Sequence, residues 1–221
     1  MAGVFKGKPF GLYRPEFEHA ACGVGVVANT KGVSSHDVIE RGIEVLANLA
    51  HRGAAGADPE TGDGAGILTQ VPDAFLRRES TALGLELPPL YEYAVGMTFL
   101  PRDDADRGRC ERSIEDVVAS EGQIFLGWRD VPVDSSSIGY VARDCQPVIR
   151  QFFVGKGKNI PDEAAFDRKL YVIRKIIESE AETASLKEPD EFYVCSLSPK
   201  VIVYKGLLMA YQVMDFYKDL S

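Results

Sequence analysis

From residue 91 to its end the chain alternates strand-like and helix-like hydrophobicity, and this alternation most constrains its fold. The clearest helix is predicted over 162–182, where one face is expected to carry five apolar residues, Phe166, Leu170, Ile173, Ile176 and Ile177. Helices are also expected over 34–50, 73–83, 104–120 and 209–220, and strands over 22–29, 67–71, 91–100, 123–132, 138–141, 147–154, 192–197 and 201–204. The last two strands flank a Ser-Pro-Lys turn and are expected to pair as a hairpin. Because no internal repeat or linker interrupts the pattern, we expect one α+β domain.

The composition excludes several classes of protein. The net charge of −8 and the scattered basic residues argue against nucleic-acid binding. No apolar run approaches the ~18 residues of a membrane span. Residues 1–21 lack the apolar stretch of a secretory signal and are too acidic and serine-poor for a transit peptide, so we expect a cytoplasmic protein.

The four cysteines are far apart and form no C-x-x-C pair; they are Cys22, Cys110, Cys145 and Cys195. Three scattered histidines add no cluster, which argues against a zinc site and against an iron–sulfur cluster in this segment. We therefore expect no cofactor and no metal here. Four unpaired thiols suit a reducing compartment.

Cys22 follows two small residues and opens an apolar, glycine-flanked segment. If the chain is cut after Ala21, the new α-amine, which titrates near ~8, can act as general base for the Cys22 thiol. Residues 1–21 would then be a leader. The alternative is a buried structural cysteine in a core strand, and this segment alone leaves both open.

Arg52, in the run His51-Arg52-Gly53, follows Cys22 by thirty residues and ends the predicted helix over 34–50. A guanidinium beside Cys22 would raise the thiolate fraction, whereas at a helix end it could simply complement the dipole. Pairing Cys22 with His51 suggests a cysteine peptidase, but no residue pattern locates the third group or the oxyanion hole. A peptidase acting only in cis on its own leader is a weaker hypothesis.

A glycine-dense stretch over 53–66 leads into a predicted strand rather than a helix, and no Gly-Lys-Ser/Thr follows it. It is therefore neither a P-loop nor a dinucleotide fingerprint. We expect a loop with several glycines at positive φ. Asp58, Glu60 and Asp63 lack the order of a calcium loop and are expected to be solvated.

Together these residues resemble a known family. Cys22-Gly-Val-Gly followed by His-Arg-Gly at this spacing is shared by class II glutamine amidotransferases. The longer string Gly-Ala-Asp58-Pro-x-Thr61-Gly-Asp-Gly-Ala-Gly narrows the resemblance to the amino end of glutamate synthase large subunits. Segments 193–208 and 215–220 are also similar to that family, so the resemblance covers nearly the whole chain.

The resemblance implies an N-terminal nucleophile hydrolase fold, a four-layer αββα sandwich, here incomplete. Residues 1–21 would be a propeptide and 22–221 the N-terminal portion of the amidotransferase domain. The Cys22 thiol would attack the side-chain amide of glutamine, release ammonia and leave a γ-glutamyl thioester that water hydrolyses, with Arg52 supporting the nucleophile. In the complete enzyme the ammonia would add to 2-oxoglutarate in a synthase domain, using FMN and an iron–sulfur cluster. The expected partners are glutamine and the remainder of the large subunit, or a second chain carrying the synthase domain.

The sequence departs from the family in one respect. An Asn-Gly pair supplies the family's oxyanion hole and a downstream arginine clamps glutamine, but no Asn-Gly occurs in these 221 residues. Losing one oxyanion donor typically costs on the order of 10²–10³ in rate. We therefore expect a fragment or split-gene half that is inactive alone. The alternative is a non-catalytic truncated domain, a structural or regulatory partner of another chain that exposes apolar sheet surface and oligomerises.

Overall fold

A computed structural model describes residues 23–184, 186–187 and 191–221 of the chain. Cys22 and the predicted leader therefore lie outside the described residues. The helices are α1 (His36–Asn48), α2 (Asp73–Ala82), α3 (Asp104–Ser120), α4 (Tyr140–Asp144), α5 (Glu163–Thr183) and α6 (Gln212–Phe216), with 3₁₀ turns η2 (Ala50–Arg52), η3 (Ser135–Ser137) and η5 (Lys218–Leu220). The strands are β1 (Ala65–Gln70), β2 (Tyr93–Leu100), β3 (Ile124–Asp130), β4 (Val148–Gly155), β5 (Tyr193–Ser198) and β6 (Val201–Gly206).

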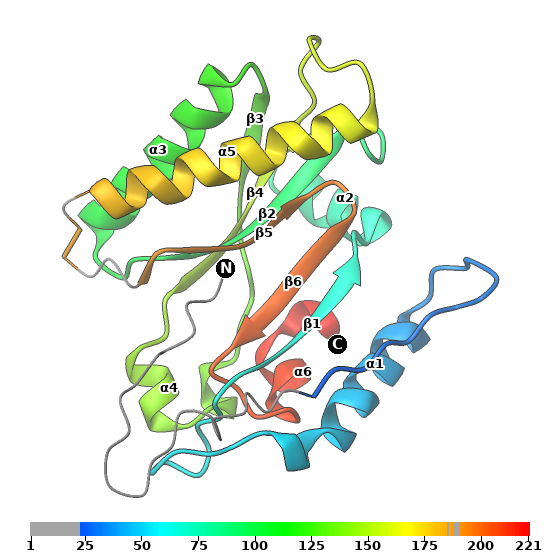
Figure 1. Cartoon of the computed structure of the whole chain (residues 1–221), viewed down its shortest axis with the longest axis vertical. Helices are drawn as coiled ribbons and strands as arrows, with labels where there is room; N and C mark the ends of the chain where they lie inside the picture. The colour runs from blue at the N-terminus through cyan, green and yellow to red at the C-terminus, as the bar shows by residue number, and fades with distance from the viewer. Residues whose placement is uncertain (1–22, 185, 188–190) are drawn as a thin grey trace, which may run out of the picture.

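A four-stranded antiparallel sheet, in the order β3-β4-β2-β5, carries α3 and α5 across one face (Figure 1). The face of α5 predicted from its periodicity is the buried one. Ile176 at its margin is half-buried, and four of the five predicted residues are fully buried, Phe166, Leu170, Ile173 and Ile177. Burying each of these side chains stabilises the fold by about 2 kcal/mol. The helix predicted over 104–120 is also confirmed, and Asp103 caps it by accepting hydrogen bonds from two backbone N–H groups of its first turn. The expected α+β class is thus confirmed.

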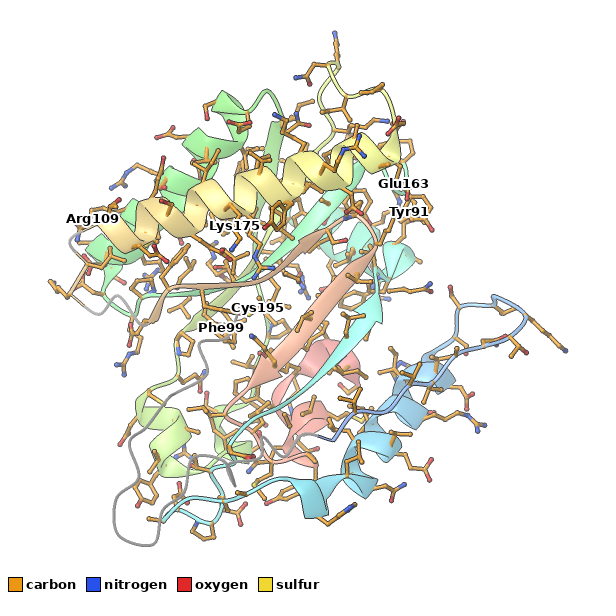
Figure 2. The ribbon with its side chains drawn as sticks, in the orientation of Figure 1. Tyr91, Phe99, Arg109, Glu163, Lys175 and Cys195 are labelled. Atoms are coloured by element: carbon orange, nitrogen blue, oxygen red, sulfur yellow. The ribbon has the colours of Figure 1, made fainter. Side chains whose placement is uncertain are left out.

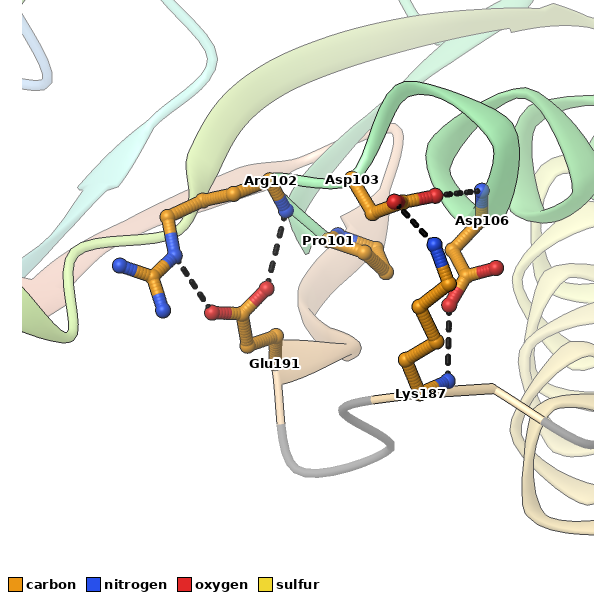
Figure 3. Close-up of a pocket in the computed structure, with 6 residues that line it drawn as sticks. All are labelled: Pro101, Arg102, Asp103, Asp106, Lys187 and Glu191. Atoms are coloured by element: carbon orange, nitrogen blue, oxygen red, sulfur yellow. Dashed lines mark hydrogen bonds and ion pairs between the residues drawn. The ribbon is translucent and has the colours of Figure 1, made fainter.

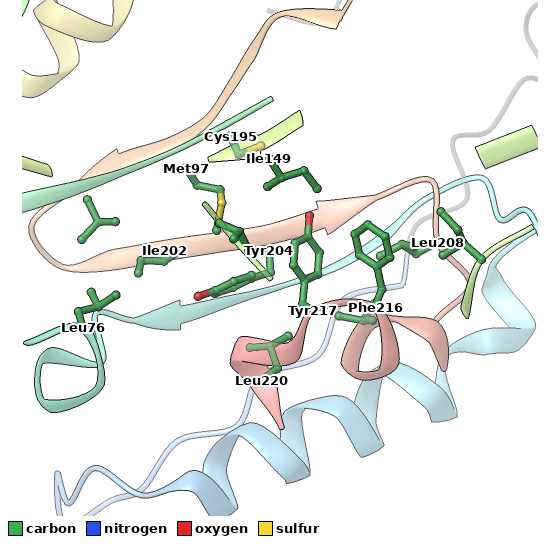
Figure 4. Close-up of a cluster of buried hydrophobic side chains, with 14 of the residues drawn as sticks. Leu76, Met97, Ile149, Cys195, Ile202, Tyr204, Leu208, Phe216, Tyr217 and Leu220 are labelled. Atoms are coloured by element: carbon green, nitrogen blue, oxygen red, sulfur yellow. The ribbon is translucent and has the colours of Figure 1, made fainter. Parts of the chain in front are cut away.

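The opposite face of this sheet packs against the antiparallel pair β1–β6 and against α2, α6 and η5. Figure 4 shows the cluster of side chains between them. Tyr204 and Tyr217 lie at its centre, with ring centroids 5.1 Å apart and planes inclined by 73°. The Tyr217 hydroxyl donates a hydrogen bond to the Lys205 carbonyl at 2.7 Å, so its polar end is satisfied inside the core.

The helix predicted over 34–50 is present as α1, which lays Ile39, Ile43 and Leu46 against the edge of this cluster. None of the residues of α1 is fully buried. The described helices include none long and apolar enough to cross a membrane.

The buried strand predicted over 22–29 is wrong for its described residues, 23–29. This segment has no strand structure, and Val24 and Val26 are 85% and 86% exposed. A short apolar run becomes a buried strand only where a neighbouring strand accepts its hydrogen bonds, and this segment instead runs beside α1. The turn that follows it is confirmed, since the Gly32 N–H donates to the Asn29 carbonyl at 3.0 Å and Gly32 has φ +68°.

Two further predictions are wrong. Residues 138–141 contain the start of α4 rather than a strand. Strands β5 and β6 both exist, but β5 pairs with β2 and β6 with β1, so they belong to different sheets instead of forming a hairpin. The short turn between them passes the chain from one sheet to the other.

Candidate active site

The His51-Arg52-Gly53 run lies where α1 passes into η2. The helix ends at Asn48, and the Gly53 N–H closes the following 3₁₀ turn on the Ala50 carbonyl at 3.1 Å. The exposed His51 ring donates a hydrogen bond from Nδ1 to the Asn48 carbonyl at 3.0 Å. Nδ1 therefore carries a proton, because a carbonyl oxygen can only accept. His51 thus contacts the end of its own helix. The predicted role of the Arg52 guanidinium lies outside the described atoms.

The segment that follows Cys22 lies directly against α1. A Cβ at Gly25 would stand 2.1 Å from Val45 Cγ1 and 3.8 Å from Leu49 Cδ1, so only glycine allows this approach. Gly25 is three residues after Cys22, and Leu49 is three residues before Arg52. The structure therefore brings the neighbours of the two predicted site residues together, while their own side chains stay predictions.

The glycine-dense stretch forms a closed loop of two short arms. Ala55 and Gly62 form an isolated antiparallel bridge. The Gly56 N–H donates to the Thr61 carbonyl at 3.3 Å, and the Asp63 N–H donates to the Ala54 carbonyl at 3.0 Å. The arm that begins at residue 53 is therefore tied to the arm that enters β1.

The expectation of several positive-φ glycines in this stretch is wrong, because Gly64 alone among residues 53–66 has positive φ, at +137°. Other glycines are needed for close approach. A Cβ at Gly62 would lie 2.3 Å from the Leu208 carbonyl oxygen, and one at Gly66 would lie 2.5 Å from that of Tyr204. These glycines let the loop and β1 pack against residues from the other end of the chain.

The expectation that Asp58 is solvated is also wrong, since it is 4% exposed. Its Oδ2 accepts hydrogen bonds from Thr61 Oγ1 at 2.7 Å and from the Val141 N–H at 3.1 Å, and its Oδ1 accepts from the Glu60 N–H at 3.2 Å. The hydrogen bond from the Thr61 hydroxyl lowers the Asp58 pKa from its ordinary value, and the N–H groups of Val141 and Glu60 lower it further. Burial of the carboxylate opposes this shift but does not cancel it. Glu60 and Asp63 are exposed, as expected.

Sequence reasoning missed this role for Asp58. The spacing of Asp58 and Thr61 indicates a local turn, and that turn exists, with the Thr61 N–H donating to the Asp58 carbonyl at 3.1 Å. The bond to Val141 spans 83 residues of sequence and has no local signal.

The described thiols do not form a nucleophilic site. Cys110 and Cys195 lie in separate hydrophobic clusters, Cys195 on β5 (Figure 2), while Cys145 is exposed. Burial raises the pKa of Cys110 to about 11 and that of Cys195 to about 12, so both stay protonated at neutral pH. No group of three or more His, Cys, Asp or Glu side chains within the described part of the chain is arranged to hold a metal.

A hollow of about 260 Å³ lies at the start of α3 (Figure 3). Its charged groups already bind one another. Glu191 accepts from Arg102 Nε at 2.6 Å and from the Arg102 N–H at 2.9 Å, and Lys187 contacts Asp103 through its ammonium group. This hollow shares no residue with the segments 23–25 and 50–64, and its pairing is that of a surface ion network.

Residues 22–221 match the family of class II glutamine amidotransferases over their whole length. The chain therefore belongs to the class II glutamine amidotransferases. It is 48% identical over 214 residues to the glutamate synthase large chain (NADPH) of Bacillus subtilis and 41% identical over 209 residues to that of Azospirillum brasilense. It is also 41% identical over 222 residues to the glutamate synthase (NADH) of Saccharomyces cerevisiae. These alignments cover 97%, 94% and 96% of this chain but only 14%, 14% and 10% of the relatives.

Proposed function

We propose that this chain is the glutamine-hydrolysing, ammonia-supplying part of a glutamate synthase, with Cys22 as the nucleophile and Arg52 as its supporting cation. The observation that carries the proposal is the boundary of the family match, which begins at Cys22. The extent of the relatives' identity, over more than nine-tenths of the chain, supports glutamate synthase within the family. In this proposal residues 1–21 are a leader and residues 22–221 belong to the amidotransferase domain.

The chemistry follows from a cysteine that carries its own free amine. The α-amine takes the thiol proton, and the sulfur attacks the carbon of the glutamine side-chain amide. When the tetrahedral intermediate collapses, the C–N bond breaks and the nitrogen leaves as ammonia with the proton that the amine had taken. Water then adds to the γ-glutamyl thioester, the C–S bond breaks, and glutamate and the thiol are released. Arg52 favours the thiolate by its positive charge.

The proposed fold is that of an N-terminal nucleophile hydrolase, an αββα sandwich. The order of the described elements supports it, since α3 and α5 cover one face of the four-stranded sheet, the β1–β6 pair packs on the other face, and α1 lies against β1. The Asn-Gly oxyanion pair does not occur in these 221 residues. The proposal therefore assigns the oxyanion hole and the substrate clamp to the remainder of the large subunit or to a partner chain.

The ammonia would be consumed by reductive addition to 2-oxoglutarate in the rest of the enzyme, where FMN and an iron–sulfur cluster supply electrons. The described residues do not fit such a cluster. Of the three described cysteines two are buried in different cores and one is exposed, so no thiolate set converges. No step of the glutamine hydrolysis passes through either group.

The test combines N-terminal mass analysis with labelling by 6-diazo-5-oxo-norleucine, a glutamine-like electrophile. We expect loss of residues 1–21 and a single adduct on Cys22. Cys22→Ala should remove the adduct, and the matched variant Cys145→Ala, which changes an exposed thiol, should keep it. A chain that retains Met1 contradicts the leader, and an adduct that persists in Cys22→Ala contradicts the nucleophile.

A second candidate is a non-catalytic structural or regulatory partner, which the exposed apolar side chains favour. Val24, Val26 and Leu68 are 85%, 86% and 61% exposed. If this surface mediates self-association, light scattering should show a mass that rises with concentration, and Val24→Ser with Val26→Ser should lower it. Leu83→Ser, which changes an exposed apolar residue on α2's end, is the control. A concentration-independent monomer would exclude self-association.

A further inference from the structure

We propose that Asp58 is a positioning residue for the Cys22–Arg52 site, because its buried carboxylate fastens the loop of residues 53–64, and with it the backbone of Arg52, to the start of α4. This inference rests on the proposed function, since it needs Cys22 as the nucleophile. Asp58 itself touches no reacting atom.

The tip of the loop, residues 58–61, packs against the start of α4. Asp58 Oδ2 accepts from the Val141 N–H at 3.1 Å, and Thr61 Oγ1 accepts from the Ala142 N–H at 3.2 Å. The Gly139 N–H donates to the Glu60 carbonyl at 3.0 Å. A Cβ at Gly139 would stand 2.3 Å from Asp58 Oδ2, so the contact depends on glycine there.

The other side of the tip is held by the start of α6. Gln212, which is 1% exposed, donates from Nε2 to the Glu60 carbonyl at 2.9 Å. The Tyr211 hydroxyl donates to Glu60 Oε2 at 3.0 Å. The tip is therefore wedged between segments that follow it by about 80 and about 150 residues in sequence.

The two arms of the loop connect the tip to the backbone of Arg52. Three backbone hydrogen bonds connect the tip to the end of α1, from Gly56 to the Thr61 carbonyl, from Asp63 to the Ala54 carbonyl, and from Gly53 to the Ala50 carbonyl. Because Gly53 directly follows Arg52, a shift of the tip displaces the residue that carries the guanidinium. A misplacement of about 1 Å in a catalytic group can lower a rate about a hundredfold.

The chemistry at this point requires a carboxylate. Three donors converge on Asp58, namely the Thr61 hydroxyl and the N–H groups of Glu60 and Val141. An asparagine has one acceptor oxygen and would turn an NH₂ group toward one of these donors. Thr61 must donate to Asp58 and accept from Ala142, which serine can do and valine cannot.

The test measures the second-order rate at which 6-diazo-5-oxo-norleucine labels Cys22 in the full 221-residue chain between pH 6 and 9. We expect Asp58→Asn and Thr61→Val to lower the rate about ten- to a hundredfold, and to move its pH profile upward as the thiolate loses its cation. Thr61→Ser should stay within about twofold of the unmodified chain, since the hydroxyl is kept. Asp162→Ala, which removes an ordinary N-cap from α5, should leave rate and profile unchanged.

Amide hydrogen exchange provides a readout that does not depend on labelling. We expect exchange at Gly56 and Asp63 to accelerate in Asp58→Asn but not in Asp162→Ala. Unchanged exchange, or accelerated exchange with an unchanged Cys22 rate and pH profile, would overturn the positioning role. If the unmodified chain retains Met1, or if the label persists in Cys22→Ala, the proposed function fails, and either outcome is visible without any loop variant.

Discussion

Replacing Asp219 with alanine should strongly destabilise this fold, because it leaves a buried cation without its main partner. Arg129 of β3 is 4% exposed and binds both carboxylate oxygens of Asp219, each at 2.8 Å. Gln151 Oε1 accepts from the same guanidinium at 3.0 Å and Glu79 at 3.3 Å. The Tyr204 hydroxyl donates to Asp219 at 3.2 Å, so the pair also connects β6 to η5.

Breaking a buried pair on one side costs about 3–5 kcal/mol. We take the lower end, about 3 kcal/mol, because Glu79 and Gln151 still compensate part of the Arg129 charge. This loss raises the unfolding equilibrium constant about 150-fold. With a urea dependence of about 2 kcal/mol per molar, the unfolding midpoint should fall by about 1.5 M. Asp219→Asn keeps the shape of the side chain and one acceptor oxygen, so its urea midpoint should lie between those of Asp219→Ala and the unmodified chain.

Urea unfolding followed by circular dichroism measures these shifts, and a double-mutant cycle isolates the pair. In an Arg129→Met background, Asp219→Asn should cost far less than in the unmodified chain. Lys218 lies on the same turn as Asp219, and Lys218→Met breaks an exposed ion pair with Asp134. This control variant should barely move the urea midpoint. An equal cost of Asp219→Asn in both backgrounds would refute the reasoning.

Three further results are expected. Because burial raises the pKa of Cys195 to about 12, iodoacetamide at pH 8 should alkylate exposed Cys145 and should reach Cys195 only after unfolding, as peptide mass mapping would reveal. The same raised pKa contributes stability that is fully present below the unfolded value of about 9 and is lost as the pH rises toward 12. The free energy of unfolding should then fall by up to about 1.4 kcal/mol per pH unit above pH 9, and less steeply in Cys195→Ala. Gly62→Ala places a methyl group 2.3 Å from the Leu208 carbonyl oxygen and should lower the free energy of unfolding by about 1–3 kcal/mol, measured by thermal or urea unfolding. Gly56→Ala, whose methyl group has nothing within 4 Å, should leave the free energy of unfolding unchanged or raise it. Equal effects of the two variants would contradict the packing at Gly62.

Helices with a strong apolar period could be predicted from sequence because the period reports local geometry. The prediction over 162–182 agrees with α5 (Glu163–Thr183) to within one residue at each end, and that over 104–120 agrees with α3. Four of the five residues expected on the buried face of α5 are fully buried, and Ile176 is half-buried. Backbone hydrogen bonds within a helix join neighbours in sequence, so a short window contains the needed information.

Errors occurred where a short apolar run depended on distant partners. Residues 138–141 look like a strand by composition, but Gly139 and Val141 bind the loop at Glu60 and Asp58, and the chain turns into α4. The run after Cys22 also has the composition of a strand, but its Gly25 packs against α1. Such runs take their structure from the contact available to them.

Membership in the class II amidotransferases could also be predicted from the sequence, because a motif is recognised without knowledge of its place in the fold. The residues that carry the motif are Cys22, the His51-Arg52-Gly53 run and the string around Asp58. Only the tertiary structure decided that β5 and β6 enter different sheets and that Asp58 is a buried anchor. Both outcomes depend on hydrogen bonds between residues far apart in the chain, such as Asp58 with Val141, and no local pattern encodes which distant donor a carboxylate will meet.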